Sequence, residues 1–340
     1  MTSASTRGLL ADLLRVLEQP GPLIILPHDN PDPDSMASAV ALKYLAHRLI
    51  GKEAYITLGG IVGRAENRAM RTYLNIELVP VSEVRFNGDV QVALVDTQPG
   101  RSNNSLPDDV VPMVVIDHHP AYAAYPGVAF LDLRDAYGAT STILTEYLQE
   151  SKLDVEPKIA TALFYGIAAE TQDLGREATA ADIEASHFLY PYANKRRLAK
   201  IENARVPREY FRVFREAIDH AALYDHKIVV SLLGEVQYPD MVAEVADFLL
   251  RLDGAEWSAA IGAYDGYLYC SMRTTDRDMN AGDLLQGVLG AKSAGGHDMI
   301  AGGRIALGSD PAERVKAACE VRTRLLTALS VDPTNGKPLA

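Results

Sequence analysis

The sequence of 340 residues contains little cysteine and no long apolar run. Its two cysteines, Cys270 and Cys319, are too few for the disulfide framework of a small secreted domain, which indicates a reducing compartment. Near the N-terminus, apolar residues recur at helical spacing and acidic residues interrupt them, unlike the core of a signal peptide. No later stretch stays apolar for the roughly 18 residues that a bilayer span requires. We therefore expect a cytoplasmic protein without membrane association.

Basic residues are also fewer than acidic ones. The chain has 33 Lys and Arg against 45 Asp and Glu, so its formal net charge is −12. A surface that coats long nucleic acid nonspecifically is therefore disfavoured. The segment 195–215 is the basic exception, with eight Lys or Arg against two Glu. A solvated helical face is the favoured interpretation of this run, and a local basic groove is the alternative.

The apolar residues make up 48% of the chain, which is enough to fill the cores of two domains. In the first half, apolar runs at 23–28, 90–96 and 111–119 alternate with helical stretches such as 34–50. Strands that are apolar throughout and separated by helices indicate a parallel sheet covered on both faces. The sequence therefore predicts a doubly wound α/β domain, in which ligands bind beyond the carboxyl ends of the strands.

The second half has a different pattern. A charged helical region precedes two strand-like runs that meet at Asp265-Gly266, a hairpin signal. A glycine-rich loop at 294–303, a strand and a closing helix follow. This order predicts a smaller α+β domain with a mixed sheet. We expect the first domain over residues 1–190, a helical linker over 191–223 and the second domain over 224–340.

Charged and imidazole residues follow three of the predicted strands. The segments are HDNPDPDS after the first strand, VDTQP after another and IDHHP after the next. Because the carboxyl ends of parallel strands lie at one edge of a sheet, these side chains are expected to meet at one point. The residues concerned are His28, Asp32, Asp34, Asp96, Asp117, His118 and His119.

Carboxylates gathered in one cleft repel each other, and a multivalent cation is the usual remedy. Carboxylate and imidazole ligands without thiolate suit Mn²⁺, Mg²⁺, Co²⁺ or Zn²⁺. The set is larger than one ion requires. Two ions that share a carboxylate would use all of it and would generate a hydroxide able to attack phosphorus. Taken alone, Asp32 and Asp34 with Pro31 and Pro33 are equally compatible with an ordinary turn and helix cap.

These segments resemble the motifs of a known family. HDNPDPDS and IDHHP are similar to the first and third motifs of the DHH phosphoesterase superfamily, and VALVDTQP resembles the second. The fourth motif of the family usually has Asp before Thr, whereas this chain has Glu170 before Thr171, and Asp173 is a competing candidate. The resemblance is closest to stand-alone members of the oligoribonuclease (nano-RNase) and bisphosphate phosphatase type.

The resemblance implies a site with two divalent ions, with Mn²⁺ expected and Mg²⁺ or Co²⁺ as alternatives. The implied ligands are His28 and Asp32 for one ion, Asp34, His118 and Glu170 for the other, and Asp96 as the bridge. The triad of Asp117, His118 and His119 would be catalytic. In it, Asp117 would orient an imidazole and His119 would touch the substrate phosphate.

The C-terminal half resembles the DHH-associated substrate domain, which is marked by a glycine-rich loop with a central histidine. Here the segment SAGGHDMIAGG places His297 between two glycine pairs. Backbone N–H groups of such a loop can approach a phosphate, and Arg273 and His297 can pair with its charge. A tight turn is the alternative for the loop, and a surface salt bridge is nearly as well supported for Arg273. The implied substrate-binding residues are His119, Arg273, Gly295, Gly296, His297, Gly302 and Gly303.

With this resemblance, the sequence predicts a metal-dependent hydrolase that cleaves phosphate esters of short nucleotides, such as nano-RNA, linear dinucleotides or nucleoside 3′,5′-bisphosphates. The expected partner is a short oligonucleotide or nucleotide, and a homodimer is compatible with the sequence. The alternatives are a cyclic dinucleotide phosphodiesterase, a single-stranded DNA exonuclease and a non-catalytic nucleotide sensor. An inorganic pyrophosphatase is disfavoured, because the Ser-Arg-Lys-Lys type motif of those proteins is absent here.

Overall fold

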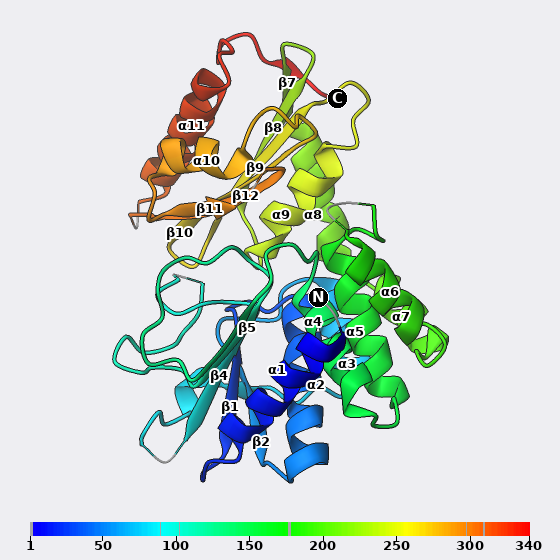
Figure 1. Ribbon diagram of the computed structural model, residues 1–340. Helices are drawn as coiled ribbons and strands as arrows, with labels where there is room; N and C mark the ends of the chain where they lie inside the picture. The colour runs from blue at the N-terminus through cyan, green and yellow to red at the C-terminus, as the bar shows by residue number, and fades with distance from the viewer. Residues whose placement is uncertain (1–2, 89, 102, 176–177, 297, 309) are drawn as a thin grey trace. The chain divides into compact units, whose positions relative to one another are not determined.

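A computed structural model describes residues 3–88, 90–101, 103–175, 178–296, 298–308 and 310–340. The chain divides into two compact units, Met1–Ala204 and Arg205–Ala340 (Figure 1). The division falls inside the segment 191–223 that the sequence predicts as a linker. Helix α7 (Lys195–Glu202) lies in the first unit and helix α8 (Arg208–Asp219) in the second.

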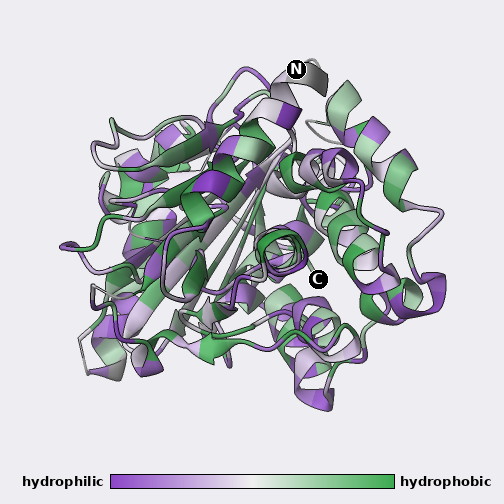
Figure 2. Ribbon diagram, turned by 60° about the horizontal axis from the view of Figure 1, so that its bottom comes forward, coloured by the Kyte–Doolittle hydropathy of each residue, from purple (hydrophilic) through white to green (hydrophobic). Residues whose placement is uncertain are grey.

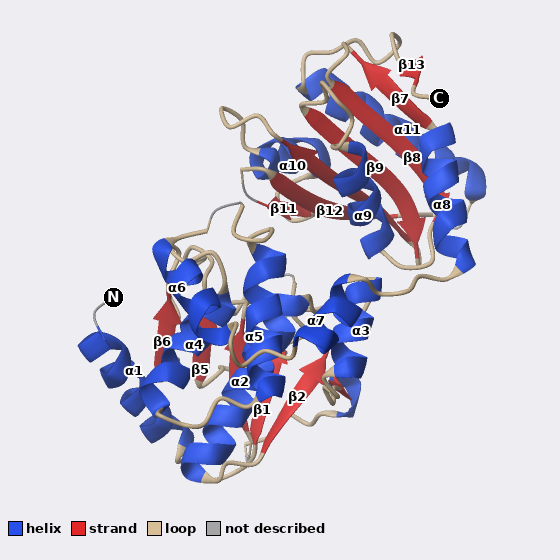
Figure 3. Cartoon of the chain, turned by 90° about the vertical axis from the view of Figure 1, so that its right-hand side faces the viewer, coloured by secondary structure: helices blue, strands red, loops and turns tan. Residues whose placement is uncertain are grey.

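The first unit is built on a six-stranded sheet in the order β3-β2-β1-β4-β5-β6, in which neighbouring strands are parallel. Its strands are β1 (Leu23–Pro27), β2 (Ala54–Leu58), β3 (Val79–Pro80), β4 (Gln91–Val95), β5 (Val114–Asp117) and β6 (Phe130–Leu133). The order reverses at β1 and β4, as in the doubly wound sheet that the sequence predicts (Figure 3). All residues of β1 and β4 are buried, because both faces of the sheet are covered.

The helices of this unit are α1 (Ser3–Leu17), α2 (Pro33–Ile50), α3 (Ala65–Tyr73), α4 (Thr140–Ser151), α5 (Pro157–Glu170), α6 (Ala180–Leu189) and α7. Most of the core lies on one face of the sheet, where α1, α2, α4 and α5 pack on the strands. On the other face, Leu26, Leu94 and Val115 form a small cluster that packs against loop residues such as Leu106 and Val128. Hydrophilic residues gather on the outer helix turns and the loops (Figure 2).

Helix α2 begins directly after the first charged segment, because the sequence there supplies the start signals of a helix. Asp32 is the N-cap, and its Oδ1 accepts the N–H of Ser35 at 2.9 Å. Pro33 occupies the first turn, where a missing N–H removes no helical hydrogen bond. Gly51 ends the helix with a φ of 67°. The cap role proposed for Asp32 is confirmed, and its Oδ2 is directed to other partners.

The second unit contains a seven-stranded sheet in the order β11-β12-β10-β9-β8-β7-β13. Its strands are β7 (Ala221–Tyr224), β8 (Ile228–Glu235), β9 (Trp257–Tyr264), β10 (Tyr267–Thr274), β11 (Ala294–Gly296), β12 (Ile300–Ala306) and β13 (Lys337–Pro338). The further helices are α9 (Asp240–Leu249), α10 (Ala281–Leu289) and α11 (Pro311–Ala328). β8 and β9 are parallel and the other neighbours are antiparallel, which confirms the predicted mixed sheet.

The predicted hairpin of this unit is confirmed. β9 and β10 pair as antiparallel neighbours around Asp265 and Gly266, whose φ values of 45° and 77° are typical of a two-residue hairpin turn. The core on one face of the sheet includes Met272 together with Leu285 of α10 and Leu325 of α11. This face is therefore closed by helices.

The prediction of a glycine-rich loop at 294–303 is wrong in part, because its two flanks are strands. β11 and β12 are antiparallel, with Gly295 opposite Gly302. At Gly303 a Cβ would approach Leu289 Cδ1 and Ser293 O to 2.7 Å, so only glycine fits this pairing. A Cβ on Gly295 or Gly302 would meet none of the described atoms within 4 Å. The hairpin therefore presents bare backbone at this pair. His297, between the two strands, lies outside the described residues.

Two further expectations concern the cysteines and the membrane. Cys270 and Cys319 are both free. Burial raises the pKa of Cys270 to about 12, so its thiol is not a nucleophile at neutral pH. No helix in the described part of the chain combines the length and the apolar character that a bilayer crossing requires.

Candidate metal centre

The three charged segments lie at one edge of the first sheet. His28 follows β1, Asp96 follows β4, and Asp117 ends β5 with His118 and His119 directly after it. β1, β4 and β5 are neighbours, and Val95 at the end of β4 pairs with Pro27 of β1 and with Ile116 of β5. The structure thus brings together the side chains that the sequence predicts to converge.

His28, Asp32 and Asp96 form the first cluster of metal-ligating groups, in which one ligand atom from each lies within 4.8 Å of the others. His28 Nε2 is 3.5 Å from Asp32 Oδ2 and 3.6 Å from Asp96 Oδ2. His28 Nδ1 lies 2.9 Å from the carbonyl oxygen of Asp29. A proton on Nδ1 donates to that carbonyl, and this contact orients Nε2 toward the carboxylates.

Asp96, His118 and His119 form the second cluster. Asp96 Oδ1 is 3.6 Å from His118 Nε2 and 3.9 Å from His119 Nδ1. Asp96 therefore belongs to both clusters, with Oδ2 toward the first and Oδ1 toward the second. A carboxylate that bridges two ions in one centre requires this arrangement.

Asp96 is held in place by its neighbours in an unfavourable backbone conformation. Its φ of 60° is left-handed, which is uncommon for a residue with a Cβ. Its N–H donates to Ile116 O on the adjacent strand at 3.0 Å, and Thr140 Oγ1 donates to its Oδ1 at 2.8 Å. Backbone strain of this kind persists only where the surroundings enforce it, and it is concentrated at functional sites.

Asp34 is buried beside the clusters and caps a helix other than its own. Its Oδ2 accepts the N–H of Thr140, and its Oδ1 accepts the N–H of Ser141, each at 2.8 Å. Both N–H groups belong to the first turn of α4, whose N-cap Ala139 has no side chain to satisfy them. The positive end of the α4 dipole therefore stabilises the Asp34 carboxylate. The role of Asp34 as a metal ligand stays a prediction, and this cap is a role that the sequence did not indicate.

The carboxylates of this edge repel one another. Burial raises the pKa of Asp96 well above its usual value, and the charges of Asp34 and Asp32 raise it further. Burial also raises the pKa of Asp34, with His118 opposing and Asp32 adding to the increase. A divalent cation would relieve this repulsion, because it favours the ionised carboxylates.

The two buried histidines respond to the same negative charges. Burial by itself lowers the pKa of His28, but the charges of Asp32 and Asp96 and the hydrogen bonds to Asp32 and the Asp29 carbonyl together raise it to about 10. Burial also lowers the pKa of His118, but the charges of Asp96, Asp34 and further nearby carboxylates together raise it to about 9. His118 Nδ1 lies 3.1 Å from Tyr137 O, while its buried Nε2 has no hydrogen-bond partner among the described residues. An imidazole nitrogen left without a hydrogen bond next to carboxylates fits a metal ligand.

The fourth motif places Glu170 at the C-terminal end of α5. Burial and the charge of Asp32 raise its pKa to about 7, so its carboxyl group lies within the charged cluster. The competing candidate Asp173 is exposed and has a φ of 57°. Burial and the charge of Asp173 raise the pKa of Glu202, away from the two clusters. These positions favour Glu170 over Asp173, and ligation by Glu170 stays a prediction.

Asp117 is buried at the end of β5 and contacts His119. Its Oδ1 is 2.8 Å from His119 Nδ1, and its Oδ2 accepts a hydrogen bond from Gln98 Nε2 at 2.6 Å. The contact through Nδ1 leaves Nε2 of His119, whose side chain is 39% exposed, facing solvent. Gln98 is fully buried and also donates to the carbonyl oxygens of His119 and Pro120, each at 3.2 Å. Gln98 belongs to the VDTQP segment, but residue spacing alone does not reveal its contact with Asp117.

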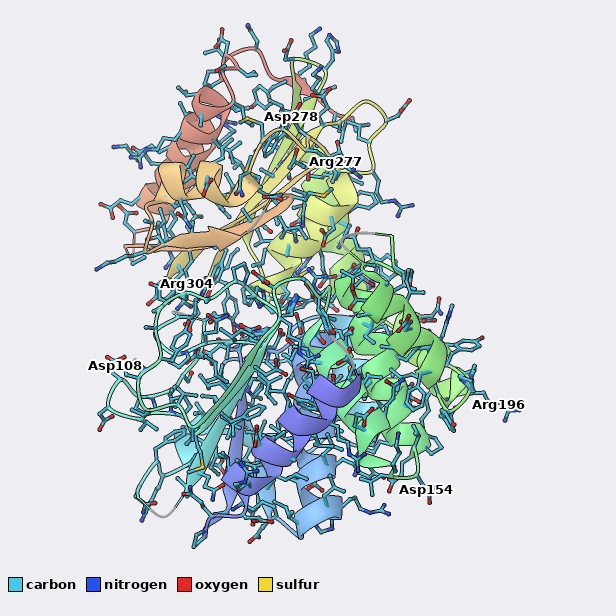
Figure 4. The ribbon with its side chains drawn as sticks, in the orientation of Figure 1. Asp108, Asp154, Arg196, Arg277, Asp278 and Arg304 are labelled. Atoms are coloured by element: carbon cyan, nitrogen blue, oxygen red, sulfur yellow. The ribbon has the colours of Figure 1, made fainter. Side chains whose placement is uncertain are left out.

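In the second unit, Arg273 is buried on β10 and already engaged. Its Nε donates to Asp247 Oδ1 at 2.5 Å, and its NH1 donates to Ser271 Oγ at 2.8 Å. This is the salt-bridge alternative, with the guanidinium buried rather than at the surface. Arg304 on β12 (Figure 4) is a basic side chain that the sequence analysis did not single out, and its guanidinium carbon lies 4.9 Å from the centroid of the Tyr267 ring. Substrate contacts stay predictions for Arg273, Gly295, Gly296, Gly302 and Gly303.

Fold and site together define a two-unit protein whose parallel-sheet unit carries a carboxylate–histidine centre suited to divalent metal. Residues 22–167 match the family described as "DHH family, N-terminal domain". The matched range contains the three charged segments and ends before Glu170. This part of the chain is therefore similar to the N-terminal domain of the DHH family.

Curated relatives extend the likeness over most of the chain. MJ1633, an uncharacterized protein of Methanocaldococcus jannaschii, is 34% identical over 323 residues, which are 92% of this chain and 65% of that protein. The cyclic-di-AMP phosphodiesterase GdpP of Bacillus subtilis is 24% identical over 313 residues, 87% of this chain and 47% of GdpP. A probable manganese-dependent inorganic pyrophosphatase of Bacillus pumilus is 28% identical over 170 residues, 50% of this chain and 54% of the pyrophosphatase. The chain thus spans 47% to 65% of the length of these relatives.

The solved structures include an exopolyphosphatase-related protein from Bacteroides fragilis with a TM-score of 0.67 and 12% identity, covering 94% of this chain and 97% of that one. At this identity the likeness concerns the fold alone. Metal binding has separate support, because a manganese-dependent relative and the two ligand clusters both indicate a divalent ion.

Proposed function

We propose that this chain is a metal-dependent phosphoesterase that hydrolyses short nucleotide substrates with water activated between two divalent ions, of which Mn²⁺ is the expected kind. The observation that carries the proposal is the position of Asp96. Its two oxygens face two ligand clusters, at 3.6 Å from His28 Nε2 on one side and 3.6 Å from His118 Nε2 on the other. The similarity to the DHH family and the manganese-dependent relative support the same reaction class.

Two divalent ions bound at this edge would bring the pKa of a shared water to about 7 and would neutralise charge on the phosphate oxygens. The protein's own groups prepare the site for that chemistry. His28 and His118 direct Nδ1 to backbone carbonyls, so their Nε2 atoms face the carboxylates, where they would bind the ions. Asp117 holds His119 through Nδ1, which orients the ring with its other nitrogen toward the place of a substrate phosphate. Because these groups are fixed by hydrogen bonds before substrate arrives, they need little reorganisation in the transition state.

The proposed substrates are nano-RNA, linear dinucleotides and nucleoside 3′,5′-bisphosphates, and the second unit is proposed to bind the part of the substrate away from the metals. GdpP, whose name gives a cyclic dinucleotide as substrate, aligns with 87% of this chain. The pyrophosphatase aligns with 50%. A formal charge of −12 also disfavours long polyanions, since each added phosphate is repelled.

Hydrolysis of a cyclic dinucleotide is the second candidate, and the alignment with GdpP favours it. Both reactions would use the same metal centre, so the difference lies in the substrate. A linear dinucleotide has a terminal phosphate that His119 can contact, whereas a cyclic one has none. We therefore expect the linear form to be the better substrate.

A substrate panel tests the proposal. The purified chain with Mn²⁺ is assayed with pApA, pGpG, adenosine 3′,5′-bisphosphate, cyclic-di-AMP, pyrophosphate and a single-stranded DNA oligonucleotide. We expect the highest kcat/KM for the linear dinucleotides and no turnover by Asp96→Asn. A higher kcat/KM for cyclic-di-AMP would favour the second candidate. Binding of nucleotides without turnover of any of them would contradict the proposal and indicate a nucleotide sensor.

A further inference from the structure

An exposed aromatic ring and an arginine lie together on the loops that carry the metal centre. Tyr122 comes three positions after His119, and Arg101 comes five positions after Asp96. The guanidinium carbon of Arg101 lies 4.6 Å from the centroid of the Tyr122 ring, and Tyr122 is still 57% exposed. A cation–π contact of this kind occupies one face of the ring and leaves the other face to solvent.

Gln98 connects Tyr122 to the metal centre. Its Oε1 accepts the N–H of Tyr122 at 2.9 Å and the hydroxyl of Tyr125 at 2.5 Å. Its Nε2 donates to Asp117 Oδ2 at 2.6 Å. One buried amide therefore fixes both the backbone that carries the Tyr122 ring and the carboxylate that contacts His119. The place of the ring relative to the metal centre is set by these hydrogen bonds.

The turn that carries Arg101 is anchored by the backbone carbonyl of Gln98, not by its side-chain amide. The Arg101 N–H donates to Gln98 O at 3.3 Å. Asn104 Nδ2 donates to Gln98 O at 3.0 Å and to Thr97 Oγ1 at 2.9 Å, which fixes the turn that carries Arg101. Within the described part of the chain, no carboxylate forms an ion pair with Arg101. Its charge is therefore available to a phosphate, and a pair held in its binding geometry beforehand loses little entropy when a ligand arrives.

Tyr190 is a comparable ring in a different setting. It is 51% exposed and has the Lys195 ammonium 4.3 Å from its centroid, but it follows α6 and packs against Phe164. This pair shares exposure and a cation with Tyr122 and Arg101. Among the residues that the structure describes, it makes no hydrogen bond to a group of the metal centre, so it provides a matched control.

We propose that Tyr122 and Arg101 form a nucleobase-binding subsite beside the metal centre, in which a base of the substrate stacks on the open face of the Tyr122 ring and Arg101 attracts the nucleotide phosphate. The inference rests on the proposed function and deepens it, because a subsite for a base selects nucleotides over pyrophosphate and other phosphates without a base. Every base has a π-face, so stacking discriminates little among bases.

Equilibrium binding tests the subsite without requiring turnover. The full chain with Mn²⁺ is titrated with AMP and with ribose 5-phosphate, which share the sugar phosphate and differ in the base. The wild-type chain should bind AMP more tightly. Tyr122→Ala should weaken AMP binding about tenfold and leave ribose 5-phosphate binding unchanged, because stacking is lost. Tyr122→Phe keeps the ring and should retain the preference, whereas Arg101→Ala should weaken the binding of both ligands.

Tyr190→Ala is the control for loss of an exposed ring, and thermal unfolding of each variant shows that the chain remains folded. Equal affinity of the wild-type chain for AMP and ribose 5-phosphate would overturn the subsite. An AMP preference that survives Tyr122→Ala, or one that Tyr190→Ala reduces equally, would also overturn it. The proposed function fails separately: if pApA is not hydrolysed but the AMP preference depends on Tyr122, the subsite stands and the reaction does not.

Discussion

The carboxyl edge of the first sheet and the glycine hairpin of the second unit, formed by β11 and β12, are held together by different kinds of contact. At the edge, Asp34, Asp96 and Asp117 are buried and accept hydrogen bonds from other segments. In the hairpin, Gly295 and Gly302 pair across two strands and carry no side chain. Long-range side-chain contacts fix the first region, whereas backbone pairing fixes the second. Substitutions at the edge should therefore change charge and activity, and substitutions in the hairpin should change stability only where a Cβ lacks room.

The largest change in stability is expected at Glu170, whose pKa is raised from 4.5 to about 7. A carboxyl group with a raised pKa contributes stability below its unfolded pKa, and that contribution is lost as the pH rises from 4.5 through 7. The Glu170→Gln variant has no titratable group at this position, so it does not lose this stability as the pH rises. We expect this variant to raise the unfolding free energy of the metal-free chain at pH 8 by up to about 3 kcal/mol, and far less at pH 5. Urea denaturation in EDTA at the two pH values measures this.

The metal-loaded chain should respond with the opposite sign. If Glu170 is a ligand, Glu170→Gln weakens Mn²⁺ binding although it stabilises the metal-free protein. Asp173→Asn is the control, and it should change neither quantity. Weaker Mn²⁺ binding by Asp173→Asn than by Glu170→Gln would show that Asp173 is the fourth-motif residue.

A large effect on activity is expected at Gln98. Gln98→Glu places a second carboxylate where the amide now donates to Asp117 Oδ2 at 2.6 Å. The carboxylate introduced by Gln98→Glu and that of Asp117 repel each other, so Asp117 no longer holds His119 in place. We expect kcat/KM for pApA to fall by about 10- to 100-fold. Gln98→Met removes the hydrogen bonds without adding charge and should lose less. Wild-type activity in Gln98→Glu would mean that this contact does not position the centre.

Two helical glycines sharpen the comparison between the units. On α5, a Cβ at Gly166 would lie 2.4 Å from Ser141 Oγ and 3.0 Å from Ala37 Cβ, close to Asp34. We expect Gly166→Ala to destabilise the protein by about 1–3 kcal/mol, as overpacking does. On α10, a Cβ at Gly287 would meet none of the described atoms within 4 Å. Because alanine has the higher helix propensity, Gly287→Ala should raise the unfolding free energy by up to about 1 kcal/mol. Thermal unfolding measures both, and shifts of the same sign would contradict this account.

The smallest effect is expected in the hairpin at Gly302. Alanine fits there, so Gly302→Ala should change the unfolding free energy by no more than about 0.5 kcal/mol. Its neighbour Gly303 has no room, and Gly303→Ala should cost about 1–3 kcal/mol. Denaturant unfolding of the pair checks the difference. Equal destabilisation by both variants would contradict this prediction, because it would show that a side chain at Gly302 also lacks room.

The metal edge could be predicted because it depends on topology. Apolar runs determine where the parallel strands lie, and the polar residues at their ends then meet at one edge, which accounts for His28, Asp96 and His118. The cap that Asp34 provides for α4 could not be predicted in this way, since Asp34 and Thr140 are 106 positions apart. The contact of Gln98 with Asp117 likewise depends on side-chain geometry.

Three of the strands that could not be predicted from the sequence are short. β3 and β13 have two residues each and β6 has four, which is too few for an apolar pattern to distinguish a strand from a loop. The glycines of β11 and β12 misled in the opposite direction, because glycine pairs are typical of turns. Here they line an antiparallel pair, where Gly303 allows the backbone to approach Leu289.

The central claim is that Asp96 joins two ligand clusters into one centre for two ions. Calorimetric titration of the metal-free chain with Mn²⁺, with parallel assays of pApA hydrolysis, tests it most directly. We predict two ions per wild-type chain. Asp96→Asn should bind fewer than two ions and lose turnover by about a thousandfold or more, because the shared ligand is gone. A single ion in the wild-type chain, or two ions with turnover retained in Asp96→Asn, would contradict the account.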